Sequence, residues 1–215
     1  MMSLYSFLSA IELGLIYSLM VLGLFLSYRV LNIPDLTVDG SFTLGAAVAV
    51  VTLSGHPILG LFAAILAGAA AGFLTAFLQT KMKIQPILAG IITMTALYSI
   101  NLMVMDDKAN VPITQQESIY TAFGSLVGKQ AQGMILSLLV LILAGAAMVL
   151  FLKTPFGLSV RATGDNESMV RSSSINADLT KTAGLMGANA CVALSGAMIA
   201  HYNCYAEVRM GIGMV

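Results

Sequence analysis

The stretch Met134–Leu152, MILSLLVLILAGAAMVLFL, contains no charged residue. A helix needs about 20 apolar residues to cross the hydrocarbon core of a bilayer. The stretch shows no alternation of apolar and polar residues, so it favours a helix over a strand. Within lipid, only a helix or a closed barrel satisfies its own backbone groups. The stretch therefore predicts a transmembrane helix and sets the fold class of the chain.

Further apolar segments of this kind occur before and after it. They are Leu8–Tyr28, Phe42–Leu53, Ile58–Leu78, Ile84–Met105 and Ala183–Tyr202. The segment Phe42–Leu53 is short for a full crossing, so we expect the second span to be discontinuous. The sequence predicts one all-α domain over residues 1–215, a polytopic transmembrane helix bundle of about six spans.

The composition supports a membrane protein. Charged residues make up 9% of the chain and hydrophobic residues 58%, whereas a soluble domain carries about 25% charged residues. The surface is therefore expected to face the lipid bilayer. The formal net charge of +0 gives no electrostatic support to a nucleic-acid partner. Cys191 and Cys204 show no CxxC or Cys/His spacing, so we expect no metal and no cofactor in this chain.

The positive charges orient the spans. With the N-terminus outside, most basic residues fall on the cytoplasmic side: Arg29, Lys81, Lys83, Lys153, Arg161, Arg171 and Lys181. Lys108, Lys129 and Arg209 fall outside, and the reverse orientation inverts this bias. We expect a multi-pass protein of the cell membrane with the loop 153–181 in the cytoplasm. The loop Asp106–Gln132 is then extracytoplasmic.

A polar segment, Asn32–Gly45 (NIPDLTVDGSFTLG), joins the first span to the short second one. Acidic residues within a membrane usually face a cavity or a partner, which favours a discontinuous element beside a solute path. The alternative is a cytoplasmic connector in which Asp and Ser/Thr side chains cap the second helix. The length of the second run does not decide the depth of Asp35 and Asp39.

The fourth span also contains polar side chains, which either line a path or form hydrogen bonds between helices. Thr93, Ser99 and Asn101 do not share one narrow helical stripe. The residues predicted for a solute path are Asn32, Asp35, Thr37, Asp39, Ser41, Thr93 and Asn101. Asn189 in the sixth span has the same two interpretations.

The loop Lys153–Lys181 is the longest polar segment between two spans. Pro155 and Gly157 are expected to end the fifth helix. The run Asp165-Asn166-Glu167 predicts an N-cap, followed by a short helix over Glu167–Ser174 with Met169 and Val170 on an apolar face. Asp178 is expected to cap the next span. A short amphipathic helix between two spans is typical of a docking surface.

Two motifs resemble one known family. FGLSVRATGDNESMVRSSSIN, residues 156–176, resembles the cytoplasmic coupling segment of ABC-importer permeases of the branched-chain amino-acid type. LNIPDLTVDGSFTLGAAV, residues 31–48, is similar to the segment after the first span in the tryptophan/tyrosine-type uptake subgroup. The positions assigned to coupling are Arg161, Ala162, Gly164, Asp165, Asn166, Met169, Val170 and Ile175.

The resemblance implies a division of labour. It implies a second permease subunit, most simply in a homodimer, two cytoplasmic ATP-binding subunits and an extracytoplasmic solute-binding protein. The chain has no GxxxxGK[ST] loop for phosphates, so ATP and Mg²⁺ belong to the ATPase partner. The implied solute is a small molecule, such as the amino acids tryptophan or tyrosine. No catalytic residue is expected in this chain.

The chain departs from the family pattern at two places. The family usually has glycine before the isoleucine, where this chain has Ser174. Family members also continue through further spans, and Met210–Val215 resembles the start of another apolar run, so we expect the last spans to be missing. A non-transporting scaffold is therefore one alternative function. An intramembrane enzyme is another, although Asp35 and Asp39 lie in one short segment rather than on two facing helices.

Overall fold

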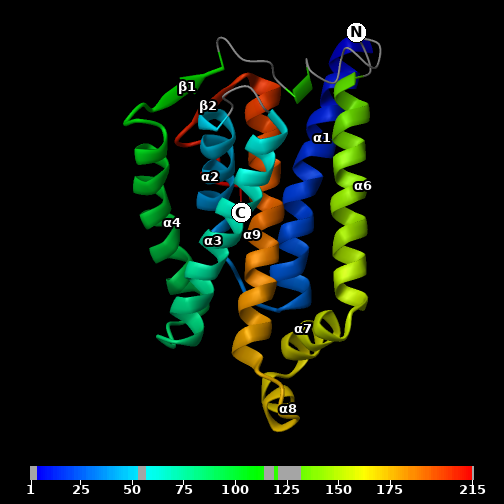
Figure 1. Ribbon diagram of the computed structural model, residues 1–215, viewed down its shortest axis with the longest axis vertical. Helices are drawn as coiled ribbons and strands as arrows, with labels where there is room; N and C mark the ends of the chain where they lie inside the picture. The colour runs from blue at the N-terminus through cyan, green and yellow to red at the C-terminus, as the bar shows by residue number, and fades with distance from the viewer. Residues whose placement is uncertain (1–3, 53–56, 114–118, 121–131, 215) are drawn as a thin grey trace.

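The computed structural model describes residues 4–52, 57–113, 119–120 and 132–214 and is almost entirely helical (Figure 1). Its elements are α1 (Leu4–Leu24), η1 (Phe25–Val30), α2 (Val38–Val51), α3 (Pro57–Thr80), α4 (Pro86–Val104), β1 (Asn110–Pro112), α6 (Gln132–Lys153), α7 (Pro155–Asp165), α8 (Glu167–Ser172), α9 (Ala177–Asn203) and β2 (Tyr205–Glu207). Within these residues, five helices are long and apolar enough to cross a membrane, with η1 continuing α1. The predicted all-α polytopic bundle is confirmed.

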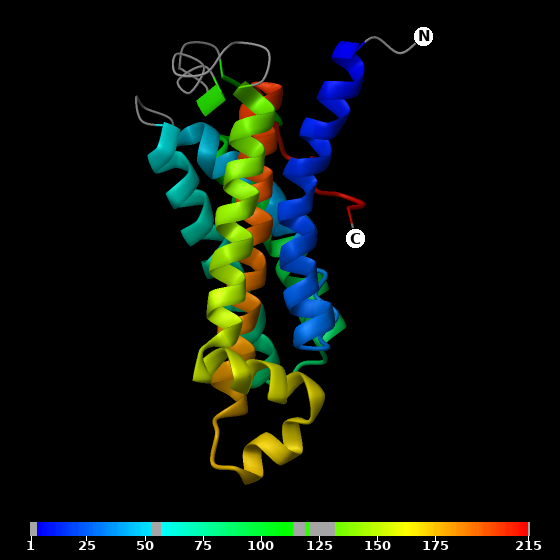
Figure 2. The same ribbon diagram turned by 90° about the vertical axis from the view of Figure 1, so that its right-hand side faces the viewer.

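Helix α9 forms the centre of the bundle (Figures 1 and 2). In its most apolar stretch 72% of the residues are buried, against 22–33% in the other four spanning helices. Small residues allow this close packing, because membrane helices approach most closely where side chains are small. A Cβ atom on Gly196 would overlap the carbonyl oxygen of Phe42, and one on Gly45 would overlap that of Ala193. Helices α2 and α9 therefore pack backbone against backbone.

Helix α2 is discontinuous with the first span. After α1 the chain widens into the π-helix η1, and residues 31–37 form an irregular connection. The connection turns back among the helices, so that α2 occupies the part of the bundle nearer to β1 and β2 (Figure 1). The predicted break is confirmed, although α2 begins at Val38 rather than at Phe42.

The two ends of the bundle differ in structure. Helices α7 and α8 lie at one end, and the N-terminus, β1 and β2 lie at the other (Figure 1). Strands β1 and β2 pair antiparallel, with Val111 opposite Ala206. Of the predicted loop 106–132, Glu117 and Lys129 lie outside the described residues. Helix α9 begins at Ala177 rather than at Ala183, because Asn176 caps a polar first turn that precedes its apolar run.

The chain after β2 folds back along the bundle (Figure 2). Residues 208–213 form turns rather than a helix, and Met210 and Met214 pack against the main hydrophobic core. Such backbone is tolerated at membrane depth where the protein satisfies its polar groups. Thr43 Oγ1 accepts a hydrogen bond from the Gly211 N–H at 3.0 Å, and Asp39 Oδ2 accepts one from the Gly213 N–H at 2.9 Å.

Candidate functional site

A closed polar network lies in the interior of the bundle. Asp35 Oδ2 accepts a hydrogen bond from Asn189 Nδ2 at 2.7 Å. Asn189 Oδ1 in turn accepts one from the Ser41 hydroxyl, and the Thr37 and Thr75 hydroxyls are 2.8 Å apart. All five side chains are fully buried. The network therefore connects the 31–37 connection and α2 to α3 and α9.

The position of Asn189 fixes the depth of Asp35. Asn189 lies near the middle of α9, which runs from Ala177 to Asn203. Asp35 is consequently deep within the bundle, and the connection is not a surface loop. Asp35 Oδ1 also accepts a hydrogen bond from the Thr37 N–H at 2.9 Å, just before α2, whereas the Thr37 side chain does not cap that helix. A carboxylate just before the start of α2 is stabilised there by the helix dipole.

A pocket of about 210 Å³ lies on the other side of α2, and we call it the α2–α4 pocket. Its lining comes from α2, α4 and the segment after β2: Asp39, Gly40, Thr43, Met94, Thr95, Tyr98, Asn101, Val208 and Ile212. Asn101 Nδ2 donates a hydrogen bond to the Gly40 carbonyl oxygen at 3.3 Å. Asn101 Oδ1 is buried and has no hydrogen-bond partner among the described residues.

The residues predicted for a solute path thus fall into two groups. Asp35, Thr37 and Ser41 belong to the closed network. Asp39 and Asn101 line the pocket. The remaining two join neither group: Asn32 is exposed with a left-handed backbone (φ 55°), and the buried Thr93 hydroxyl donates to the carbonyl oxygen of Ala89 in its own helix. Asp35 and Asp39 therefore do not form a facing carboxylate pair.

As predicted, Thr93, Ser99 and Asn101 do not share one stripe on α4. Thr93, Leu97 and Asn101 are buried at successive intervals of four residues, whereas Ser99 is exposed. The sequence gives no signal that Thr75 joins the buried network. Asn189 carries a weak signal, because it is a lone amide within an apolar run.

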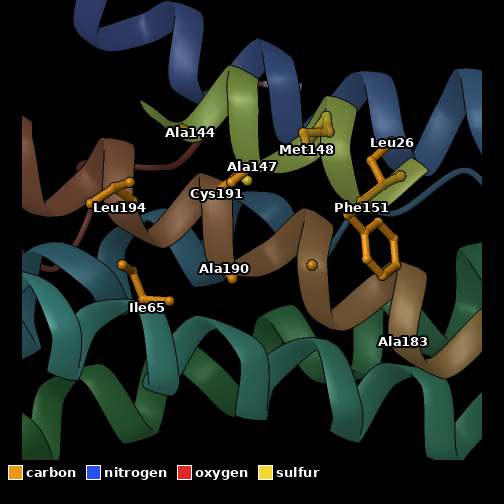
Figure 3. A pocket seen from close by; sticks show the side chains of 11 residues that line it. Leu26, Ile65, Ala144, Ala147, Met148, Phe151, Ala183, Ala190, Cys191 and Leu194 are labelled. Carbon is orange, nitrogen blue, oxygen red and sulfur yellow. The ribbon is translucent and has the colours of Figure 1, made fainter. Parts of the chain in front are cut away.

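A second pocket, of about 290 Å³, is apolar (Figure 3). It lies among α6, α9, α3 and η1, with Phe151 toward the Ala183 end and Ile65 toward the Leu194 end. No charged side chain lines it. It therefore offers nothing to orient a polar solute, and we do not regard it as a solute site.

The segment between α6 and α9 contains two helices rather than the one predicted. Pro155 does not end a helix but begins α7, where the Thr154 hydroxyl caps the Gly157 N–H at 3.0 Å. Proline is well suited to a first helical position, since its missing N–H leaves no bond unmade there. Gly157 is buried in α7, close to the carbonyl group of Phe151. The pair Thr154-Pro155 was the sequence signal that could have predicted the start of α7.

Helix α7 packs against the bundle and α8 extends away from it (Figure 2). The Thr163 and Thr180 hydroxyls are 2.7 Å apart and join α7 to α9. A Cβ atom on Gly164 would overlap the carbonyl oxygen of Val30, so glycine permits α7 to approach η1. Asn166 forms the predicted N-cap of α8 and accepts a hydrogen bond from the Met169 N–H at 3.1 Å. The helix ends at Ser172 rather than at Ser174.

The eight residues assigned to coupling differ in exposure. Those open to a partner are Arg161, Ala162, Asp165, Asn166, Met169 and Ile175. Met169 is a large apolar side chain, and 66% of its surface is exposed. Gly164 is partly buried, and Val170 is 3% exposed. The predicted common face of Met169 and Val170 is therefore wrong, because Val170 points inward and anchors α8.

Ion pairs fix α8 to the start of α9. Glu167 accepts hydrogen bonds from Arg171 at 2.9 Å and from Lys181 at 2.6 Å, and Arg171 also pairs with Asp178. The hydrogen bond from Lys181 holds the pKa of Glu167 below its usual range, and Arg171 adds to this effect. Asp178 was expected to cap α9, but Asn176 does so by accepting from the N–H groups of Asp178 and Leu179.

The turn after α8 explains the departure at Ser174. Ser174 has φ 61°, in the left-handed region that favours glycine. A side chain there costs roughly 1–2 kcal/mol, partly offset because glycine loses more freedom on folding. We expect Ser174→Gly to stabilise the turn by about 0.5–1 kcal/mol and to slow hydrogen exchange of the 167–176 amides. Ser172→Gly is the matched control, since Ser172 lies within α8 and glycine there costs about 0.5 kcal/mol. Unchanged or faster hydrogen exchange of the 167–176 amides in Ser174→Gly would show that the backbone at Ser174 is not strained.

Comparison with known proteins agrees with this architecture. Residues 6–215 match the family described as the permease component of branched-chain amino acid transport systems. The chain is 36% identical over 208 residues to a tyrosine transport system permease protein of Clostridioides difficile, covering 96% of this chain and 68% of that one. It is 32% identical over 207 residues to an uncharacterised protein of Rickettsia prowazekii, covering 96% and 72%. No solved structure matches the chain.

The family match covers both the half-length helix α2 and the α7–α8 segment. The protein is therefore a transmembrane permease of the ABC type, and it belongs to the family of permease components of branched-chain amino acid transport systems.

Proposed function

We propose that this chain is the membrane-spanning subunit of an ABC importer for an amino acid, and that α8 is its docking helix for the ATP-binding subunit. The observation that carries the proposal is the exposed Met169 side chain on a helix that extends beyond the bundle. An exposed large apolar side chain on a surface helix suits a groove in a soluble partner.

The way α8 is attached supports a role in transmitting force. Its buried Val170 and the Glu167–Lys181 ion pair connect it to the first turns of α9. Helix α9 then runs without interruption to Asn189, which bonds to Asp35 and Ser41. A displacement of α8 by an ATPase thus reaches α2 through one helix and two hydrogen bonds. Spatial connection alone does not establish coupling, so the link is part of the proposal.

The distribution of charge supports a cytoplasmic position for α8. Arg29, Lys81 and Lys153 end or follow helices that reach the same end of the bundle as α7 and α8. Lys108 and Arg209 lie next to β1 and β2 at the other end. Cytoplasmic loops carry the excess of Lys and Arg in membrane proteins. The proposed orientation places the N-terminus outside.

The remaining partners follow from the proposed role. A second permease subunit, most simply another copy of this chain, would complete the pathway. ATP and Mg²⁺ would bind to the ATPase subunits, and an extracytoplasmic protein would deliver the solute. The name of the Clostridioides difficile relative supports an aromatic amino acid, tyrosine or tryptophan, as the solute.

A photocrosslinking amino acid at position 169 tests the docking of α8 in cells that make the whole transport system. We expect it to capture a protein that carries the GxxxxGK[ST] phosphate-binding loop. Met82 provides a matched control, because it is also an exposed methionine (60%) and follows α3 at the same end of the bundle. Position 82 is expected to capture at most one tenth as much.

A charge substitution gives the functional counterpart. Met169→Glu is expected to reduce co-purified ATPase and tyrosine uptake at least about tenfold, since a charge in an apolar groove costs more than about 1.4 kcal/mol. Met82→Glu is expected to leave both unchanged. Capture of the ATPase from position 82 but not from position 169 would show that α8 is not the docking helix.

A further inference from the structure

Asn101, which lines the α2–α4 pocket, has a side-chain amide whose orientation is fixed. The Asn101 side chain is 1% exposed, and its Nδ2 donates to the Gly40 carbonyl oxygen at 3.3 Å. Turning the amide over would place its oxygen against that carbonyl oxygen, so Oδ1 has to take the other direction. Oδ1 has no hydrogen-bond partner among the described residues. A buried carbonyl oxygen without a donor is unusual and calls for a missing partner.

The other polar side chains of the pocket can also act as acceptors. Asp39 contributes a carboxylate, and Thr43, Thr95 and Tyr98 contribute hydroxyl groups. The Thr95 hydroxyl proton is used within α4, since Thr95 donates to the carbonyl oxygens of Ile91 and Ile92 at 3.0 and 2.9 Å. None of the nine lining residues carries a positive charge. The pocket thus favours a cationic group with several N–H donors and disfavours a carboxylate or a phosphate.

The size of the pocket limits what it encloses. Sites that surround a whole small ligand usually measure about 300–1,000 Å³, whereas this pocket measures about 210 Å³. The pocket therefore accommodates the charged head of a solute, not a complete aromatic amino acid. Tyr98 is 42% exposed and stands at the same lining, where its ring can contact an adjoining apolar part.

We propose that the α2–α4 pocket is a binding subsite for the ammonium group of an amino acid or amine solute. Asn101 Oδ1 and the Asp39 carboxylate receive its N–H donors, and the exposed hydroxyls complete the shell. This inference rests on the proposed transport function for its role in uptake. The binding itself requires no ATPase, so the two proposals fail separately.

Equilibrium binding of radiolabelled tyramine to the full chain in lipid nanodiscs tests the subsite. Tyramine has the aromatic ring and the ammonium group but no carboxylate. We expect saturable binding that tyramine and tyrosine displace and that 3-(4-hydroxyphenyl)propionate, which has no ammonium group, does not. Equal displacement by the propionate, or no binding because the pocket holds only water, overturns the proposal.

Three variants locate the binding. Asp39→Asn keeps the size of the side chain and an oxygen for the Gly213 N–H, and it is expected to weaken tyramine binding about tenfold or more through loss of charge. Asn101→Leu is expected to have a comparable effect. Thr95→Val is also expected to weaken tyramine binding, because it removes a hydroxyl from the pocket lining. The hydrogen bonds that this hydroxyl donates lie within α4, so the change removes no such bond between helices. Ser99→Ala is the control, because exposed Ser99 is on α4 but outside the pocket.

The outcomes separate the subsite from protein stability and from docking. Each variant is first compared with the wild type by gel filtration and thermal unfolding, so that a misfolded protein is not counted as a lost site. Binding that is equal in wild type, Asp39→Asn and Thr95→Val overturns the subsite. If tyramine binds as expected but position 169 captures no ATPase, the subsite stands and the docking proposal fails.

Discussion

Asn189→Asp is expected to destabilise the folded protein by about 3–5 kcal/mol, and the second change Asp35→Asn is expected to restore most of that loss. In the wild-type protein, Asn189 Nδ2 donates to Asp35 Oδ2 at 2.7 Å. The single variant instead places two carboxylates side by side in the buried network. An uncompensated buried charge costs about 3–5 kcal/mol. Asn189 is fully buried, so water does not relieve the repulsion.

The exchanged pair keeps the hydrogen bonds among positions 35, 37, 41 and 189, but it loses the bond that Asn189 Nδ2 donates to the Leu185 carbonyl oxygen at 3.0 Å. An asparagine at position 35 accepts from the Thr37 N–H with its oxygen and donates with its nitrogen to an aspartate at position 189. The second oxygen of that aspartate accepts from the Ser41 hydroxyl. The carboxylate moves away from the start of α2 and loses part of its dipole stabilisation, about 0.3–1 kcal/mol. Recovery is therefore expected to be incomplete.

Thermal unfolding of the purified protein in nanodiscs measures this cycle. Asp35→Asn alone is the matched control and is expected to cost less than Asn189→Asp, because it adds no second buried charge. The coupling free energy between the two positions should be at least about 2 kcal/mol. Additive losses in the double variant would show that the two side chains do not interact.

Gly196→Ala is expected to cost at least about 1–3 kcal/mol and to remove most of the correctly folded protein. The new methyl group would overlap the carbonyl oxygen of Phe42, so α2 and α9 would have to separate along their contact. The same contact holds the buried network together, since Ser41 precedes Phe42 and bonds to Asn189. The loss is thus larger than the overlap alone.

Gly145→Ala is the matched control in α6. No atom lies within 4 Å of a Cβ atom at Gly145, and alanine favours a helix by about 1 kcal/mol over glycine. The control is expected to be as stable as the wild type or slightly more so. Fluorescence-detected size exclusion after heating compares the two variants. Equal retention of both would contradict the backbone contact between α2 and α9.

The fold was largely predictable because its signals are local. Long apolar runs identify the five spanning helices, and the short run identifies α2 as a partial crossing. The helix boundaries were harder to predict, because polar residues can belong to a helix when a cap satisfies its first N–H groups. Asn176 extends α9 in this way, and Thr154 with Pro155 begins α7. A proline was interpreted as a helix end where it serves as a helix start.

The candidate site was less predictable because its contacts are distant in sequence. Asp35 and Asp39 are four residues apart, yet one enters a closed network and the other lines a pocket. Thr75 and Asn189 complete the network from other helices. Their roles depend on how α2, α3 and α9 pack, which no single segment encodes. Val170 shows the same limit on a smaller scale, since the inward face of α8 depends on the position of α9.

The bond between Asp35 and Asn189 has a consequence for the synthesis of the protein. The two residues are 154 positions apart. At roughly 5–20 residues per second, Asn189 is made about 8–30 s after Asp35. During that interval the Asp35 carboxylate lacks the hydrogen bond from Asn189. Residues 31–37 therefore reach their final depth only after α9 has been translated as far as Asn189, so α2 completes its assembly long after it leaves the ribosome.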